Sequence, residues 1–398
     1  MRIAAQITFW LSAAALLYSY AGYPLLLFLI SSLRPRPVKR NEFLPTVTLI
    51  ITAYNEERHL RAKLENTLAL DYPAELLEII VASDCSSDGT DEIAREFKNR
   101  GVKLVRQRER LGKTAAQNSA VEQASGEIIL FSDATSSYQR DVVRMLMPNF
   151  ADPGVGCVAG RLVYVDPAES HVGKGARSYW SYEVFLKKHE SRAGSLIGAS
   201  GCLYAVRRSA YVPLYHEACS DFIIATKMVE QGLRAVYEPL AVCTEETNRQ
   251  SGREMNMRVR IIAQTFTDLW RHRAMMNPLR RGFYALQLLS HKVMRYFVPF
   301  FLIVLLAASA ILARGSLSFQ VLLVLQLAGY GAGVLAWLLD RAGVRSRLLV
   351  LPQYFLLANI ASLIAFYKFL RGERYARWEP IRDSASIQPQ RTHVENNA

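Results

Sequence analysis

The chain has 398 residues, a formal net charge of +13 and an apolar fraction of 51%. Its length is enough for a soluble domain together with membrane segments. The basic residues flank apolar stretches, which fits the cytoplasmic face of a membrane better than a nucleic-acid surface, so nucleic acid is not an expected partner. Five cysteines without a Cys-x-x-Cys pair argue against a disulfide framework and a zinc site.

The N-terminal stretch is apolar, and no charged residue lies between Ile3 and Leu33. A bilayer span needs roughly 20 apolar residues, so this stretch is long enough to cross one. The basic run Arg34–Arg40 follows it in place of a small-residue cleavage site. We therefore expect residues 1–33 to be a retained transmembrane anchor and not a cleaved signal peptide.

A middle segment, residues 40–285, alternates apolar runs with helical patterns. We expect strands at Val47–Thr52, Leu76–Ser83, Val102–Arg106 and Ile128–Ser132, with helices between them. Alternating strands and helices predict an α/β domain with a doubly wound, mostly parallel sheet. Further along, we expect a strand region at Gly154–Val165, helices at Tyr179–His189, Cys219–Gln231 and Met255–Arg273, a strand at Ala235–Pro239 and a polar loop at Glu245–Gln250.

Three more uncharged apolar stretches follow, Phe297–Ala313, Gly315–Leu339 and Leu348–Tyr367. We expect residues 286–370 to form transmembrane or interfacial helices and residues 371–398 to form a basic tail. Three spans would place this tail on the opposite side from the middle domain, whereas its Lys and Arg residues favour the cytoplasmic side. The conflict disappears if the first or the last of the three stretches is interfacial or re-entrant.

Polar side chains follow several of the predicted strands. Asp84 and Asp133 end two strands, Tyr54 and Glu56 follow another, and Lys113 begins a helix. In open α/β sheets, ligands bind outside the carboxyl ends of the strands. Each residue alone fits a turn or a helix cap. Together they predict a diphosphate site in which a hard divalent cation bridges carboxylate and phosphate oxygens.

Other nucleotide-binding folds fit less well. Gly112-Lys113-Thr114 lacks the earlier glycine of a phosphate-binding P-loop, and no Gly-x-Gly-x-x-Gly follows the first strand. A cytosolic sugar nucleotidyltransferase would share the sheet pattern, but the predicted anchors argue against it.

In these motifs the sequence resembles glycosyltransferase family 2, the inverting nucleotide-sugar transferases of the type A fold, over about residues 45–275 and in the membrane flanks. Thr52–Glu57 is similar to the first nucleotide-binding segment of the family. Ser83–Thr90 is similar to the second, with Ser83 where an aspartate is usual. Gly112-Lys113 resembles the Gly-Lys step of the family.

The same resemblance covers the catalytic motifs. Asp133-Ala-Thr135 stands at the Asp-x-Asp metal motif, with a hydroxyl in place of the second carboxylate. Ser220-Asp221 stands at the catalytic-base motif, and Gly198–Gly201 resembles the acceptor-side loop. The Gln-x-x-Arg-Trp signature of processive synthases is not present, although Arg258-Val-Arg260 lies in that neighbourhood without the tryptophan.

The resemblance implies a role for each site residue. The implied donor-binding residues are Ala53, Tyr54, Glu56, Asp84, Lys113 and Asp133. Asp133 would also hold Mg²⁺ or Mn²⁺, and Asp221 would act as general base. Arg258 and Arg260 would stabilise the leaving diphosphate, or alternatively contact lipid headgroups. The implied acceptor-side residues are Trp180, Gly198, Ser200 and Gly201.

For the whole chain, the resemblance implies a membrane-bound inverting hexosyltransferase in cell-surface polysaccharide synthesis. It would use a nucleotide sugar, a UDP-sugar by resemblance, and a lipid-linked or polysaccharide acceptor, at a bacterial inner membrane with the middle domain cytosolic. Membrane lipids, a second copy of the chain and other polysaccharide-assembly proteins are further partners that it allows. A processive synthase and a non-catalytic nucleotide-sugar-binding subunit are the alternatives.

Overall fold

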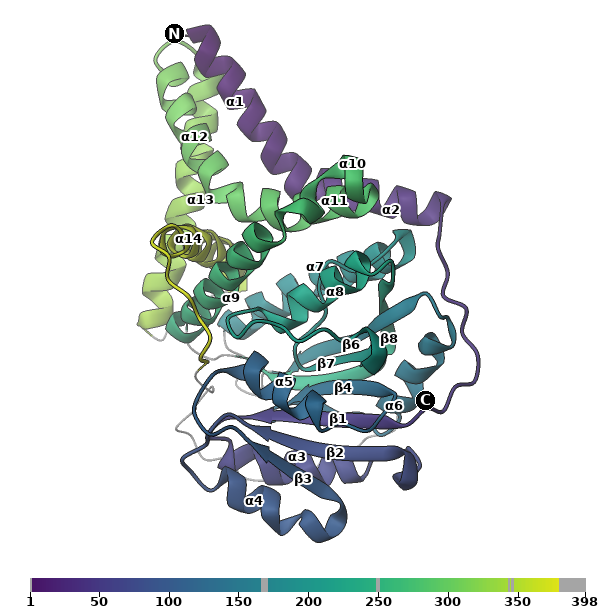
Figure 1. The fold of residues 1–398 in the computed structure, drawn as a ribbon. Coiled ribbons are helices and arrows are strands. Elements are labelled where there is room, and N and C mark those ends of the chain that lie inside the picture. The colour runs from purple at the N-terminus through teal and green to yellow at the C-terminus, as the bar shows by residue number, and fades with distance from the viewer. Residues whose placement is uncertain (1, 166–170, 248–250, 343, 345–346, 379–398) are drawn as a thin grey trace, which may run out of the picture.

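The computed structural model describes residues 2–165, 171–247, 251–342, 344 and 347–378. Within these residues, one eight-stranded sheet has the order β3-β2-β1-β4-β7-β6-β8-β5, with helices on both faces (Figure 1). The strands are β1 (Val47–Ala53), β2 (Leu77–Ser83), β3 (Val102–Arg106), β4 (Ile128–Asp133), β5 (Ser137–Tyr138), β6 (Val155–Val165), β7 (Leu203–Arg207) and β8 (Arg234–Glu246). The helices of the sheet domain are α3 (Glu57–Leu68), α4 (Thr90–Glu96), α5 (Lys113–Glu122), α6 (Val142–Leu146), α7 (His171–Ala193), α8 (Ser220–Glu230), α9 (Ser251–Arg271) and α10 (Pro278–Arg281).

The first half of the sheet is parallel, as the sequence predicts. β1 pairs with β2 and with β4, and β2 pairs with β3, all in parallel. Every residue of β1 is buried. A strand covered by helices on both faces reads as a continuous apolar run, and this is the signal that the sequence carries there. The register places Ala53 opposite Ser83 and Thr52 opposite Asp133, so the donor-side motifs end at one edge of the sheet.

The second half of the sheet is mixed. β7 lies between β4 and β6 and runs antiparallel to both, while β6 and β8 are parallel and β5 pairs antiparallel with β8. An apolar run as short as Leu203–Arg207 carries no information about strand direction. β8 is also longer than the predicted Ala235–Pro239, and it continues to Glu246.

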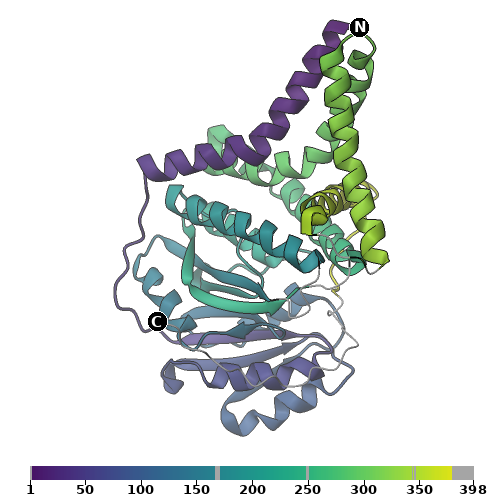
Figure 2. The same ribbon diagram turned by 180° about the vertical axis from the view of Figure 1, so that it is seen from behind.

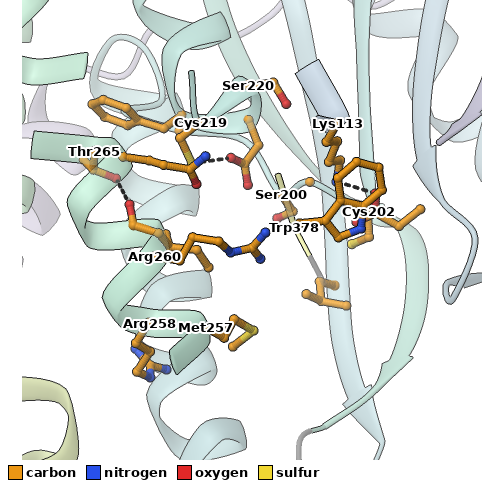
Figure 3. Close-up of a pocket in the computed structure, with 18 of the residues that line it drawn as sticks. Lys113, Ser200, Cys202, Cys219, Ser220, Met257, Arg258, Arg260, Thr265 and Trp378 are labelled. Carbon is orange, nitrogen blue, oxygen red and sulfur yellow. Dashed lines mark hydrogen bonds and ion pairs between the residues drawn. The ribbon is translucent and has the colours of Figure 1, made fainter. Parts of the chain in front are cut away.

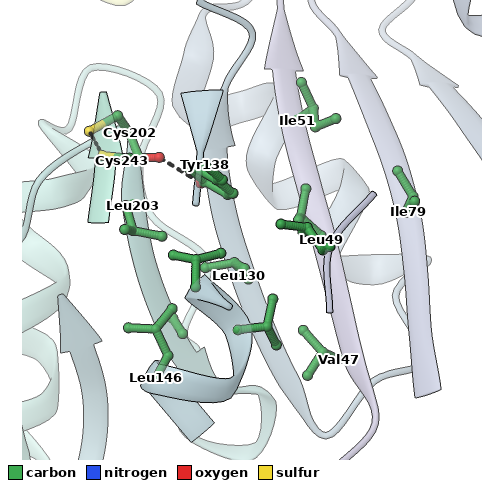
Figure 4. Packing of buried hydrophobic residues seen from close by; sticks show 14 of the residues in the cluster. Val47, Leu49, Ile51, Ile79, Leu130, Tyr138, Leu146, Cys202, Leu203 and Cys243 are labelled. Carbon is green, nitrogen blue, oxygen red and sulfur yellow. Dashed lines mark hydrogen bonds between the residues drawn. The ribbon is translucent and has the colours of Figure 1, made fainter. Parts of the chain in front are cut away.

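Two hydrophobic cores hold the sheet between its helices. One core packs β1, β2, β4 and β8 against α3, α4 and α6, and it contains Leu49, Leu130 and Leu203 (Figure 4). The other packs the opposite face against α5 and α8, with Phe131 stacked on Tyr204. The cysteines, all of which lie in the described part of the chain, are free thiols.

The membrane helices flank this domain in the sequence. They are α1 (Arg2–Leu17), α2 (Tyr23–Leu33), α11 (Phe283–Leu288), α12 (Arg295–Ala313), α13 (Leu317–Arg341) and α14 (Val350–Leu370), with π-helical turns at Tyr18–Gly22 and Leu289–Met294. Among the described residues, four helical stretches are long and apolar enough to cross a membrane: 2–33, 283–313, 317–341 and 350–370. The stretch predicted at Phe297–Ala313 is therefore extended by residues before it.

These helices are not arranged as four parallel spans. α1, α12 and α13 project together from the sheet domain, whereas α2 and α14 lie across the base of this projection (Figures 1 and 2). Arg2 donates to the carbonyl of Gly315 at the far tip, 3.1 Å away. α12 leads the chain away from the sheet domain, and α13 leads it back. The described residues after α14, up to Trp378, therefore lie on the side of the sheet domain, which is the side that the basic character of the tail favours.

Candidate functional site

A cavity of about 890 Å³ lies at the carboxyl ends of β1 and β4. One part of its wall comes from these strand ends and from the start of α5, and another comes from the loop before β7 and from α8. The rest comes from β6, the end of β8, α7, α9, the π-helical turn before α12, α14 and the segment after α14. The cavity therefore joins the predicted donor edge of the sheet to the membrane helices.

Lys113 and Asp133 form an ion pair at the donor end of this cavity. Lys113 begins α5, directly after Gly112, which has the left-handed φ of 105°. Burial alone would lower the pKa of the Lys113 ammonium, but the carboxylates of Asp133, Asp221 and Glu245 raise it above its ordinary value. The end of β4 thus accommodates a cationic group beside Asp133.

Glu245 is a second carboxylate at this end of the cavity, and the sequence did not indicate it. The Thr135 hydroxyl donates to Glu245 Oε1 over 3.0 Å. Burial and the neighbouring Asp133 carboxylate raise the pKa of Glu245 to about 7. Glu245 was predicted to begin a polar loop, but it lies near the end of the long strand β8.

The oxygen atoms at this end fit a divalent cation. Within the described ranges, no group of three or more His, Cys, Asp or Glu side chains is arranged to hold a metal ion by itself. Mg²⁺ is commonly bound by one or two carboxylates together with substrate phosphates, and it needs no complete protein cage. The Asp133 and Glu245 carboxylates and the Thr135 hydroxyl supply hard oxygen donors of that kind.

Asp221 faces Asp133 and Lys113 across the loop before β7. A methyl group on the Gly201 α-carbon would lie 3.3 Å from Asp221 Oδ2, 3.3 Å from Lys113 Nζ and 3.7 Å from Asp133 Oδ2. Three groups predicted from separate motifs therefore surround one backbone position. A side chain at Gly201 would fill the space between them.

The acceptor-side loop is held from two directions. The backbone N–H of Ala199 donates to the Asp221 carbonyl over 2.7 Å, which ties the loop to α8. From α7, Lys187 donates to the Ala199 carbonyl over 3.0 Å and to Ser200 Oγ over 2.6 Å. Burial lowers the pKa of Lys187. The predicted residues Gly198, Ser200, Gly201 and Trp180 all line the cavity.

Tyr54 and Asp84 lie outside this cavity, behind the segment that follows α14. Asp84 is fully buried, and its carboxylate accepts from the backbone N–H groups of Leu111 and Gly112 over 2.9 and 3.0 Å. Burial raises the pKa of Asp84 in spite of these bonds. The Arg110 guanidinium lies 3.8 Å from the centre of the Tyr54 ring.

The segment Tyr375–Trp378 crosses from α14 to this donor edge. Gln264 donates to the Tyr375 carbonyl over 2.6 Å, and Arg377 Nε donates to the Arg110 carbonyl over 3.1 Å. The Trp378 ring meets the Tyr54 ring edge-on, with centroids 5.9 Å apart. The predicted tail thus contributes to the site, while its residues beyond Trp378 lie outside the described part of the chain.

The two predicted arginines of α9 differ in their surroundings. Arg258 pairs with Glu254 over 2.8 Å and contacts Tyr354 of α14. Arg260 lines the cavity, and its side chain extends toward Ser200 and Trp378, whereas Arg258 points away from them (Figure 3). Of the two, Arg260 is the one directed at the centre of the site.

Comparisons with known proteins show what the sheet domain is similar to. Residues 48–213 match the family model of glycosyl transferase family 2. Poly-beta-1,6-N-acetyl-D-glucosamine synthase of Staphylococcus aureus (strain COL) is 32% identical over 219 residues, 53% of this chain and 52% of that protein. The synthase of the same name from Staphylococcus epidermidis is 30% identical over 204 residues, 50% of this chain and 49% of that protein. The chain spans about half the length of the curated relatives it matches.

The fold has a solved counterpart. The structure of a mannosyltransferase from Pyrobaculum calidifontis, in complex with GDP-Man and Mn²⁺, superimposes with a TM-score of 0.71. It covers 91% of this chain and 99% of that chain at 24% sequence identity. This likeness extends over the sheet domain and the membrane helices. Residues 48–213 are therefore similar to glycosyltransferase family 2, and the sheet domain has the type A fold.

Proposed function

We propose that the chain transfers a sugar, with inversion at the anomeric carbon, from a nucleoside-diphosphate sugar to an acceptor hydroxyl at a membrane. The observation that carries this proposal is the convergence on Gly201. Lys113 and Asp133 from the donor side and Asp221 from α8 lie around this one α-carbon, in a cavity that continues to the membrane helices.

The chemistry assigns a task to each side of the cavity. The acceptor oxygen attacks the anomeric carbon from the face opposite the diphosphate. The bond between that carbon and the diphosphate oxygen breaks, and its electron pair leaves with the diphosphate. Asp221 takes the hydroxyl proton as general base. Lys113 and Arg260 place positive charge where the diphosphate accumulates negative charge.

A divalent cation, Mg²⁺ or Mn²⁺, belongs to this proposal. When bound, it would neutralise charge on the diphosphate, and Asp133 would hold it from the end of β4. The Mn²⁺ in the mannosyltransferase of the same fold and the oxygen donors beside Asp133 support this assignment.

The donor that we propose is a UDP-sugar, with UDP-N-acetylglucosamine as the first candidate. The support is the resemblance of the nucleotide-binding motifs and the name of the relatives, which are poly-β-1,6-N-acetylglucosamine synthases. We place the sheet domain on the cytosolic side of a bacterial inner membrane, because nucleotide sugars are made in the cytosol. The acceptor would be a lipid-linked or polysaccharide chain, because the cavity reaches α9 and α14.

A processive synthase is the second candidate function. The relatives are polymer synthases by name. Several aromatic side chains line the cavity and could hold a sugar chain on their faces, among them Tyr179, Trp180, Tyr354 and Trp378. The processive-synthase signature has a tryptophan directly after its arginine, and no tryptophan follows Arg260 directly. Trp378 of the tail brings an aromatic ring to the cavity instead. Sizing the products made in nanodiscs separates the two, because long polymer beside unused acceptor indicates processive addition.

The test of the proposed function is a panel of nucleotide sugars. Purified full-length protein in nanodiscs is incubated with UDP-, GDP- and dTDP-sugars, with and without Mn²⁺, and nucleoside diphosphate release is measured. We expect release from one donor class, and only with the cation. No release from any donor, with the protein folded, would favour the non-catalytic subunit.

A further inference from the structure

We infer that Glu245 supplies the second carboxylate of the cation site, in place of the aspartate that Thr135 replaces. This inference rests on the proposed function, because it assigns residues to the cation of that reaction. It concerns the residues of this chain and not whether the family uses a metal ion.

The first observation is the sequence of the turn that follows β4. Asp133-Ala-Thr135 has one carboxylate, and a hydroxyl can ligate a cation without contributing charge. A diphosphate carries several negative charges, and the number of charged ligands sets how strongly a hard cation is retained. A site with one protein carboxylate is therefore weaker than a site with two.

The second observation is the strand pairing at the β5 edge of the sheet. The short strand β5 follows this turn and pairs antiparallel with β8, so that Ser137 lies opposite Thr244. Extended by one residue, this register brings Glu245 opposite Ser136, next to Thr135 in the turn after β4. The Thr135 hydroxyl donates to Glu245 Oε1 over 3.0 Å, which leaves Oε2 free of that bond.

The third observation is where the carboxylate lies. Asp133, Thr135 and Glu245 all line the same cavity. Glu245 is half-buried near the end of a strand that is paired on both sides, with β6 and with β5, so its backbone position is fixed. Sites built on strands hold their ligands more accurately than sites on loops.

The experiment measures cation binding directly. Purified full-length protein is titrated with Mn²⁺ in the presence of UDP, and separately of GDP, while free Mn²⁺ is followed by its electron paramagnetic resonance signal. We expect Glu245→Gln to weaken Mn²⁺ binding at least about 10- to 100-fold, because the loss of a direct ligand should cost no less than the loss of a residue that only supports one. The matched control is Glu246→Gln, the same charge change at the next residue of β8, and it should bind Mn²⁺ nearly as the wild type does.

A compensating variant sharpens the test. Adding Thr135→Asp to Glu245→Gln moves the carboxylate back to the turn after β4, and it should restore most of the lost Mn²⁺ affinity. Thermal unfolding of each variant checks that the fold is intact.

Three results would overturn the inference. Glu245→Gln could bind Mn²⁺ as the wild type does, or Glu246→Gln could weaken binding equally, which would indicate a general charge effect. Failure of Thr135→Asp to restore binding in a folded protein would mean that Glu245 only orients Thr135. If wild-type protein binds no Mn²⁺ with either nucleotide, the cation of the proposed function fails as well, whereas sugar transfer is judged separately by donor turnover.

Discussion

The backbone N–H of Cys219 donates to Asp268 Oδ2 over 3.1 Å, so that α9 holds the first turn of the helix that carries Asp221. The hydroxyl of Tyr215 donates to the other oxygen of the same carboxylate. Asp268 is fully buried, and burial raises its pKa to about 8. Sequence reasoning gave no sign of this residue, because an aspartate in a basic amphipathic helix reads as a solvated side chain.

Asp268 should therefore position Asp221 without touching substrate. Asp268→Ala leaves a buried N–H without its acceptor, at a cost of about 1–3 kcal/mol. We expect kcat to fall while the KM for the donor stays near normal. Asp268→Asn keeps an acceptor oxygen and should recover most of the activity. Equal losses in both variants, or a loss confined to KM, would contradict a positioning role.

Asp133 should control cation-dependent donor binding. Asp133→Asn keeps the shape of the side chain but removes the charge that a hard cation requires. In calorimetry, we expect the variant to lose the increase in nucleotide affinity that Mn²⁺ gives the wild type. Unchanged Mn²⁺-dependent affinity would remove Asp133 from the cation site.

Trp378 should strengthen donor binding from the tail, because its ring lies against Tyr54, which we expect to bind the nucleoside. An aromatic pair contributes about 0.5–1.5 kcal/mol, so Trp378→Ala should weaken donor binding about 2- to 10-fold. Trp378→Phe keeps a ring and serves as the control. Tighter binding in Trp378→Ala would show instead that the tail obstructs the donor site.

The buried Lys63 should make the free energy of unfolding depend on pH. Its ammonium is buried beside Ser136 and the Tyr138 ring, and burial lowers its pKa from 10.5 to about 7. Between these values the unfolded chain holds a proton that the folded protein releases. Lys63 therefore favours folding most above pH 10.5, and this contribution is lost as the pH falls toward 7.

The matching measurement is the thermal unfolding of Lys63→Met between pH 7 and 10.5. We expect the variant to be more stable than the wild type at pH 7, with a difference that shrinks toward pH 10.5. Lys98→Met changes an exposed lysine and should show no such trend. A stability difference between Lys63→Met and the wild type that stays constant over this pH range would contradict the lowered pKa of Lys63.

The parts of the site that the sequence predicted are those carried by local signals. Apolar runs ending in Asp84 and Asp133 place both residues at one sheet edge, because parallel strands share the position of their carboxyl ends. Glu245 and Trp378 could not be predicted in the same way. Glu245 reaches the site through the pairing of a two-residue strand, and Trp378 reaches it through the path of the chain after α14. Both depend on tertiary contacts that no local pattern encodes.

The orientation of the membrane helices could not be predicted from the sequence either. Hydropathy predicted the apolar stretches, but it could not tell a projecting helix from one that lies across the base. α14 packs its buried side chains on α9, with Ala361 and Ala365 against Val259 and Phe266. This packing against the sheet domain, and not its composition, sets its orientation.

The role of Asp221 can be measured by comparing Asp221→Asn with the wild type in donor binding and in sugar transfer. If Asp221 is the general base at the convergence on Gly201, the variant should bind the nucleotide sugar with near-normal affinity. Its transfer rate should fall by a factor on the order of 100 to 10,000, the usual contribution of general base catalysis. Transfer at the wild-type rate by a folded Asp221→Asn protein would contradict this role of Asp221, because another group would then take the acceptor proton.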